Sequence, residues 1–194
     1  MIEVSKTHIH WNYYIALEND LGRVARYIEF IEANFKTYSI ELAHILLASS
    51  SEIDVVMKEL CVLLSPSKKP ENINEYRKII KEKLSSFIDE KAYSHRYGLT
   101  LSPWSNWQGE QNPDWWKSYN NVKHQRNIYF NEANLKNVLN SIAALMIVNL
   151  YYYREKLNKE FDYPYEFKEV TNKLNSKSKL FKLQSNYYYD TLIV

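Results

Sequence analysis

The chain has very little glycine, with three glycines in 194 residues against a usual proportion of about 7%. Loops that cradle phosphate groups need several closely spaced glycines, but Gly22, Gly98 and Gly109 stand far apart. This spacing excludes dinucleotide-binding and P-loop chemistry. The five prolines are scattered and there is no Gly/Ser tract, which excludes collagen-like and low-complexity chains. Any phosphate binding must therefore come from side chains.

Cysteine, net charge and long apolar runs are also scarce. The single Cys61 forms no internal disulfide, and its apolar neighbours predict a buried thiol. The net charge of +2 is too small to give the whole protein a positive potential that would attract nucleic acid or an anionic membrane. The apolar stretch from Ile142 to Tyr153 is shorter than the roughly 20 residues that cross a bilayer, and the N-terminus lacks a signal-peptide pattern. We therefore expect a soluble cytoplasmic protein without a membrane partner.

Apolar periodicity predicts helices in the first third of the chain. A helix of roughly 25 residues is expected where apolar side chains recur at steps of four and three, namely Leu17, Leu21, Val24, Ile28, Ile31 and Phe35. Ser39 is a plausible N-cap for a second helix that ends at Leu64, before Ser65 and Pro66. This second helix is apolar almost all the way round, which is typical of a central, buried helix.

The remaining pattern predicts three more helices. They are expected over Ile73 to Glu90, from Asn112-Pro113-Asp114 onward, and from near Asn131 to about Leu157. A long loop from Tyr97 to Gln111 precedes the fourth helix, and its tryptophans predict that it packs over a core or a site.

We therefore predict an all-α protein: an antiparallel helical bundle of about five helices, with a long capping loop before the fourth. Residues 1–160 are expected to form the bundle. Residues 161–194 are rich in lysine and tyrosine, and we expect this C-terminal extension to pack on the bundle or on a partner.

Charged side chains interrupt the apolar second helix at Glu52, Asp54 and Lys58. A buried charge without a partner costs several kcal/mol, so these groups need partners. The fourth helix offers them in two adjoining polar rows, which are Tyr119, Lys123 and Arg126, and Asn120 and His124. Such a face suits an anion such as phosphate, with His124 as the group that titrates near neutrality.

This arrangement resembles the HEPN superfamily of helical nucleotide-binding and ribonuclease domains. The shared features are a buried helix with acid and lysine, a helix with the Asn120-x-x-x-His124 step, and then a long apolar helix. HEPN domains carry an arginine, often followed by a polar residue, and a histidine four to six residues after the arginine. Tyr119 occupies the arginine position here, and Arg126 lies further along the same predicted face.

The resemblance implies metal-independent RNA cleavage or RNA binding in a prokaryotic toxin or antiphage defence system, by a homodimer or with a partner protein of that system. His124 would act as acid and base, Arg126 and Lys123 would stabilise phosphate, and Asn120 and Tyr119 would orient them. Glu52 and Asp54, with Lys58, would support the site. No cofactor and no metal are expected.

A second hypothesis remains open. The polar face of the fourth helix would then be a structural salt-bridge network with Glu52, Asp54 and Lys58, in a non-catalytic helical module that assembles with partner proteins. Tyr119 at the arginine position favours this alternative, whereas the clustering of Lys123 and His124 with Arg126 favours RNA. The tryptophans of the loop and the fourth helix are better explained as aromatic core than as a base-stacking surface.

Overall fold

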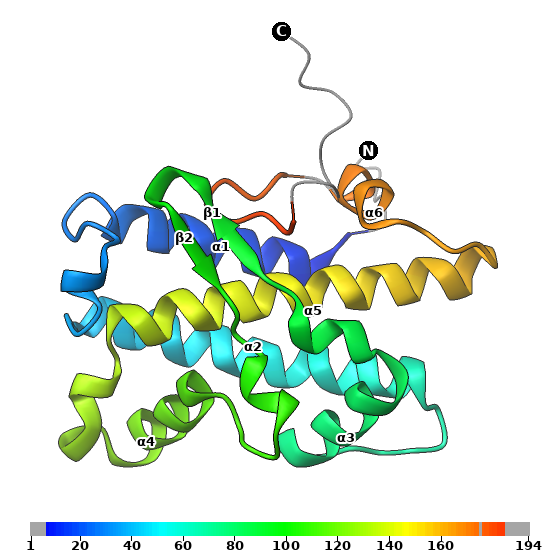
Figure 1. Ribbon diagram of the computed structural model, residues 1–194, viewed down its shortest axis with the longest axis horizontal. Helices are drawn as coiled ribbons and strands as arrows, with labels where there is room; N and C mark the ends of the chain where they lie inside the picture. The colour runs from blue at the N-terminus through cyan, green and yellow to red at the C-terminus, as the bar shows by residue number, and fades with distance from the viewer. Residues whose placement is uncertain (1–6, 175, 185–194) are drawn as a thin grey trace, which may run out of the picture.

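A computed structural model describes residues 7–174 and 176–184 and confirms the all-α class. Within those residues the chain forms six α-helices (Figure 1): α1 Ile9–Val24, α2 Ile40–Leu64, α3 Ile73–Lys83, α4 Asp114–Tyr129, α5 Leu135–Phe161 and α6 Phe167–Lys173. The sixth is the short α6, which lies in the predicted C-terminal extension.

Short elements join the helices. Five 3₁₀ turns occur in the described chain: η1 Glu32–Asn34, η2 Ser85–Asp89, η3 His95–Tyr97, η4 Ser105–Gln108 and η5 Phe130–Glu132. Two three-residue strands, β1 Ala92–Ser94 and β2 Leu99–Leu101, form an antiparallel hairpin in which Ala92 faces Leu101. The hairpin occupies part of the predicted long loop, so that loop is more regular than its sequence indicates.

The centre of the molecule is the pair α2 and α5, which lie side by side (Figure 1). Ser39 caps α2 as predicted, because its hydroxyl accepts the N–H of Leu42 at 3.1 Å. The side chain of Asn134 caps α5 in the same way by accepting the N–H of Asn137. Nearly every residue of α5 from Leu135 to Tyr153 is buried, so this helix forms the middle of the core.

The two central helices run parallel, which differs from the antiparallel arrangement expected between them. Leu135 donates to the carbonyl of Thr37 where both helices begin, and Lys159 donates to the carbonyl of Leu63 where both end. The segment between α2 and α5 holds α3 and α4. It carries the chain from the end of α2 back to the end of the molecule where α2 began, so α5 can start there and run parallel to α2. In contrast, α1 and α4 run antiparallel to α2 (Figure 1).

Two predicted helices are shorter than expected. The first ends at Val24, and the apolar spacing that continues through Ile28 and Ile31 belongs to a turn and a 3₁₀ segment. This turn buries Phe30, whose ring centre lies 4.7 Å from that of Tyr97. The third ends at Lys83 rather than Glu90, because the chain tightens into η2 and places Phe87 in the core.

The predicted aromatic core is confirmed. Trp104 and Trp107 of the capping loop are fully buried, and their ring centres lie 4.5 Å apart. They contact Phe87, and Trp104 also packs edge-on against Trp115 of α4. Cys61 is fully buried, as its apolar neighbours predicted.

Residues 176–184, here called the C-terminal strap, pack on the bundle. The buried carboxylate of Glu18 accepts the backbone N–H groups of Lys179 and Leu180 at 2.9 and 3.0 Å and the hydroxyl of Ser178. Lys182 forms an antiparallel bridge with Tyr93 of β1. The strap therefore joins α1 to the hairpin. Among the described helices, none has the length and apolarity needed to span a membrane.

Candidate functional site

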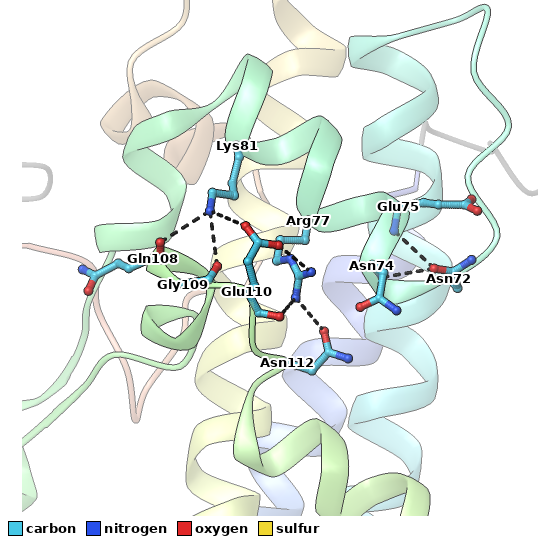
Figure 2. A network of polar contacts seen from close by, with 9 residues as sticks. All are labelled: Asn72, Asn74, Glu75, Arg77, Lys81, Gln108, Gly109, Glu110 and Asn112. Atoms are coloured by element: carbon cyan, nitrogen blue, oxygen red, sulfur yellow. Dashed lines mark hydrogen bonds and ion pairs between the residues drawn. The ribbon is translucent and has the colours of Figure 1, made fainter.

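The start of α4 is anchored to α3 by two cationic side chains (Figure 2). The buried guanidinium of Arg77 donates to the carbonyl and carboxylate of Glu110 at 2.5 and 3.0 Å, and to the side-chain oxygen of Asn112 at 3.4 Å. Lys81 donates to the carbonyl of Gly109 at 3.2 Å. These contacts fix the end of the capping loop, and so they fix the direction in which α4 leaves it.

The first half of α4 is held by its aromatic face. Trp115 donates its indole N–H to the carbonyl of Pro103 at 2.8 Å, and Trp116 packs against Tyr119. Tyr119, predicted to contact phosphate, is only 7% exposed. The ammonium of Lys123 lies 5.4 Å from its ring centre, within the range of a cation–π contact. The buried ring of Tyr119 therefore contacts the ammonium of Lys123.

A kink divides the polar face of α4. Gln125 has φ −141° and ψ 50°, outside the helical region, between His124 and Arg126. The two polar rows predicted for a continuous helix therefore stop at His124, and Arg126 belongs to the segment beyond the kink. No local sequence signal marks this break, because Gln125 is neither proline nor glycine.

Asn120 lies in a cleft of about 490 Å³ between α2, the start of α3 and the first turns of α4. Asp54 of α2 lines the same cleft, so the structure brings these two predicted site residues together. We call this site the amide cleft, because four asparagines line it; its lining residues are Asp54, Glu71, Asn72, Ile73, Asn112, Trp116, Lys117, Asn120 and Asn121.

Arg126 lies in a different cleft, of about 340 Å³, with His44 and Ile40 of α2 and with Asn127 and Phe130. Lys123, His124 and Arg126 are all exposed, and within residues 7–174 and 176–184 none of the three forms an ion pair. We call these three residues the cationic edge of α4.

Glu52 binds a histidine, but not the one expected. Its carboxylate lies 2.6 Å from Nδ1 of His10 in α1, and Glu59 lies 3.5 Å from Nε2 of the same ring. The hydrogen bond that His10 donates to Glu52 raises the pKa of His10, and the charge of Glu59 adds to this, against the opposing effect of burial. The expectation that α4 supplies the partner of Glu52 is thus wrong, because α1 packs against this face of α2.

Asp54 and Lys58 also lack the expected ionic partners on α4. Asp54 accepts the hydroxyl of Tyr76 in α3 at 3.1 Å, and burial together with the charge of Asp54 raises the pKa of that phenol. Lys58 is exposed. An exposed lysine needs no compensating carboxylate, so the physical reason for predicting a network around it does not apply.

Two groups escaped the sequence reasoning. The first is His10 of α1, whose ring bonds to the carboxylates of α2, while His8 packs edge-on against Tyr153. No group of three or more potential metal ligands occurs among the described residues. The second group is the set of asparagines in the amide cleft, which come from three separate segments and give no local motif.

No protein-family model, no curated protein and no solved structure matches this chain.

Proposed function

We propose that this protein binds single-stranded RNA through the cationic edge of α4, as a HEPN-like protein of a prokaryotic defence or toxin system. The observation that carries the proposal is the state of Lys123, His124 and Arg126: they lie close in sequence on the two sides of the kink at Gln125, they are exposed, and they form no ion pairs in the described chain. Cationic side chains without carboxylate partners are suited to phosphate oxygens.

The same observation disfavours the structural alternative. A salt-bridge network would have joined the cationic edge to Glu52 and Asp54, whose contacts are instead with His10 and Tyr76. The resemblance to HEPN domains supports RNA as the anionic ligand, and the Asn120-x-x-x-His124 step lies on the exposed side of α4. An RNA strand can therefore reach the side chains of the cationic edge.

Direct RNA binding is measured by fluorescence anisotropy with a labelled single-stranded RNA of mixed sequence, between 50 and 200 mM salt. The test variant is Lys123→Ala/His124→Ala/Arg126→Ala. We expect at least a tenfold loss of affinity, and a salt slope shallower by about 1.4, since two permanent charges each contribute about 0.7.

The matched control is Lys69→Ala/Lys78→Ala, which removes the same permanent charge from exposed lysines in another cleft. Equal losses in both variants would show that only net charge matters and would contradict the proposal. Unchanged thermal unfolding in both variants confirms that the comparison concerns binding.

RNA cleavage is the second part of the proposal, and it is assigned to His124. The imidazole would take the proton of a ribose 2′-OH while the 2′-oxygen attacks phosphorus, and the imidazolium would return that proton to the leaving 5′-oxygen, with Arg126 stabilising the charge on the phosphate. We expect products with 2′,3′-cyclic phosphate ends, and none from His124→Ala. RNA that is bound but never cleaved would restrict the function to binding.

A further inference from the structure

The amide cleft lies beside the cationic edge, and phosphate binding leaves it unused. We propose that the amide cleft binds a single unpaired nucleobase, and that guanine fits it best. This inference rests on the proposed function, because the base belongs to the RNA nucleotide whose phosphate contacts Lys123 and His124.

Two asparagines offer hydrogen-bond donors to the cleft. The side-chain oxygen of Asn72 accepts the N–H groups of Asn74 and Glu75, and that of Asn112 accepts from Arg77 at 3.4 Å (Figure 2). Both oxygens are therefore occupied by the protein. The NH₂ groups of Asn72 and Asn112 make no hydrogen bond within the described residues, so they can donate to a ligand.

Two other asparagines offer acceptors. Asn120 donates its NH₂ to the carbonyl of Trp116 at 2.9 Å, and Asn121 donates to both carboxylate oxygens of Glu132 at 3.0 and 3.2 Å. In the part of the chain that the structure describes, the side-chain oxygens of Asn120 and Asn121 accept nothing. Among the described residues, the asparagines that line the cleft thus leave both donors and acceptors for a ligand, and the edge of a base carries both kinds of group.

Asp54 gives the cleft its preference for guanine. The hydroxyl of Tyr76 bonds to Oδ1 and fixes the carboxylate, whereas Oδ2 has no hydrogen bond within residues 7–174 and 176–184. Guanine presents N1–H beside its 2-amino group, and a carboxylate accepts both. An asparagine NH₂ can then donate to O6, and the ring of Trp116 adds apolar surface.

Position along α4 connects the cleft to the cationic edge. Asn120 precedes Lys123 and His124 by three and four residues, so one helical turn, on the order of 5 Å, separates them along the axis. This is comparable to the separation of base and phosphate within one nucleotide. A guanine nucleotide can therefore place its base in the amide cleft while its phosphate contacts the edge.

The test uses the full chain and isothermal titration with GMP, UMP and ribose 5-phosphate. We expect GMP to bind more tightly than UMP, and ribose 5-phosphate to bind weakest. Asp54→Asn keeps an oxygen for the Tyr76 hydroxyl but loses the charge, and it should weaken GMP binding roughly tenfold. Asp20→Asn, an exposed carboxylate on α1 paired with Arg23, is the matched control and should leave GMP binding unchanged.

Absence of GMP binding, or equal affinity for GMP and ribose 5-phosphate, would overturn the inference. An Asp54→Asn variant that binds GMP as the original protein does would overturn it as well. If Asp54→Asn unfolds at a lower temperature, Asn120→Ala provides an independent loss of one cleft acceptor, with the same expected direction. If both variants fold and both still bind GMP as the original protein does, the guanine site is wrong.

The two proposals fail separately. If the triple variant of the cationic edge retains full RNA affinity while Asp54→Asn loses GMP, the proposed RNA-binding edge is wrong and the base site stands. If the triple variant loses RNA affinity while Asp54→Asn retains GMP, the edge stands and the base site is wrong.

Discussion

The attachment of the C-terminal strap to α1 through Glu18 gives the sharpest stability prediction. Glu18 is 2% exposed and accepts hydrogen bonds from the backbone N–H groups of Lys179 and Leu180, from the Ser178 hydroxyl and from the Tyr14 hydroxyl. The change Glu18→Ala removes the acceptor of both backbone N–H groups, whereas the Ser178 and Tyr14 hydroxyls lie 2.8 Å apart and can still bond to each other. It leaves a methyl group beside two backbone donors of the strap.

The expected loss follows from these donors. A hydrogen bond to a charged group contributes about 1.5–3 kcal/mol, and a buried donor left without a partner costs about 1–3 kcal/mol. The total loss in free energy of unfolding is limited, because the strap can detach and its backbone can then bond to water. The cost of detachment is the lost burial of Phe181 and Leu183. We expect Glu18→Ala to lower the free energy of unfolding by about 3 kcal/mol, and Glu18→Gln by roughly half of that.

Two measurements check this expectation. Urea denaturation gives the free energy of unfolding, and native-state hydrogen exchange reports the protection of the Lys179 and Leu180 amides. Asp20→Ala is the control, since Asp20 lies on the same helix but is exposed, and its effect should stay within about 0.5 kcal/mol. The reasoning is refuted if Glu18→Ala lowers the free energy of unfolding no more than the control does. It is also refuted if the Lys179 and Leu180 amides exchange as fast in the original protein as in Glu18→Ala.

Other predictions concern protonation, glycine and the thiol. Glu52 raises the pKa of His10, so the folded protein binds that proton more tightly than the unfolded chain. Thermal stability should be highest below about pH 6.5 and decrease as pH rises through the raised value, a dependence that His10→Gln should flatten. Gly22→Ala should stabilise by about 0.5 kcal/mol in urea, because an added Cβ meets no atom within 4 Å in the last turn of α1, whereas Gly98→Ala, at φ +62°, should destabilise by about 1 kcal/mol. Burial raises the pKa of Cys61 to about 12, so a thiol reagent should modify it only after unfolding; rapid labelling of the native protein would contradict this.

Local signals in the sequence predicted the elements they govern directly. The Ser39 cap depends on neighbouring residues and is confirmed; α2 is central as predicted, but its apolar perimeter is buried only in part, since Val55 and Val62 are exposed. Burial of Trp104 and Trp107 followed from the size and apolarity of their rings. The start of α4 lies one residue after the predicted one, because Pro113, expected as the first residue of the helix, is its N-cap.

The errors arose where distant segments compete. Apolar spacing continued past Val24, but the turn that buries Phe30 against Tyr97 ends the helix there. Glu52 was expected to meet α4, and the imidazole that binds it lies 42 residues earlier in the chain. Periodicity within one helix cannot identify which other helix packs on a given face.

The parallel pair α2 and α5 has a consequence for how the chain folds. Ser49 donates to Ser141 at 2.8 Å in the buried interface, across a sequence separation of 92 residues. The central contact of this helical protein is thus non-local, and its formation requires closure of a long loop that contains α3 and α4. We expect folding to be slower than in bundles whose neighbouring helices are consecutive, and nascent chains that lack α5 to leave the apolar perimeter of α2 uncovered during synthesis.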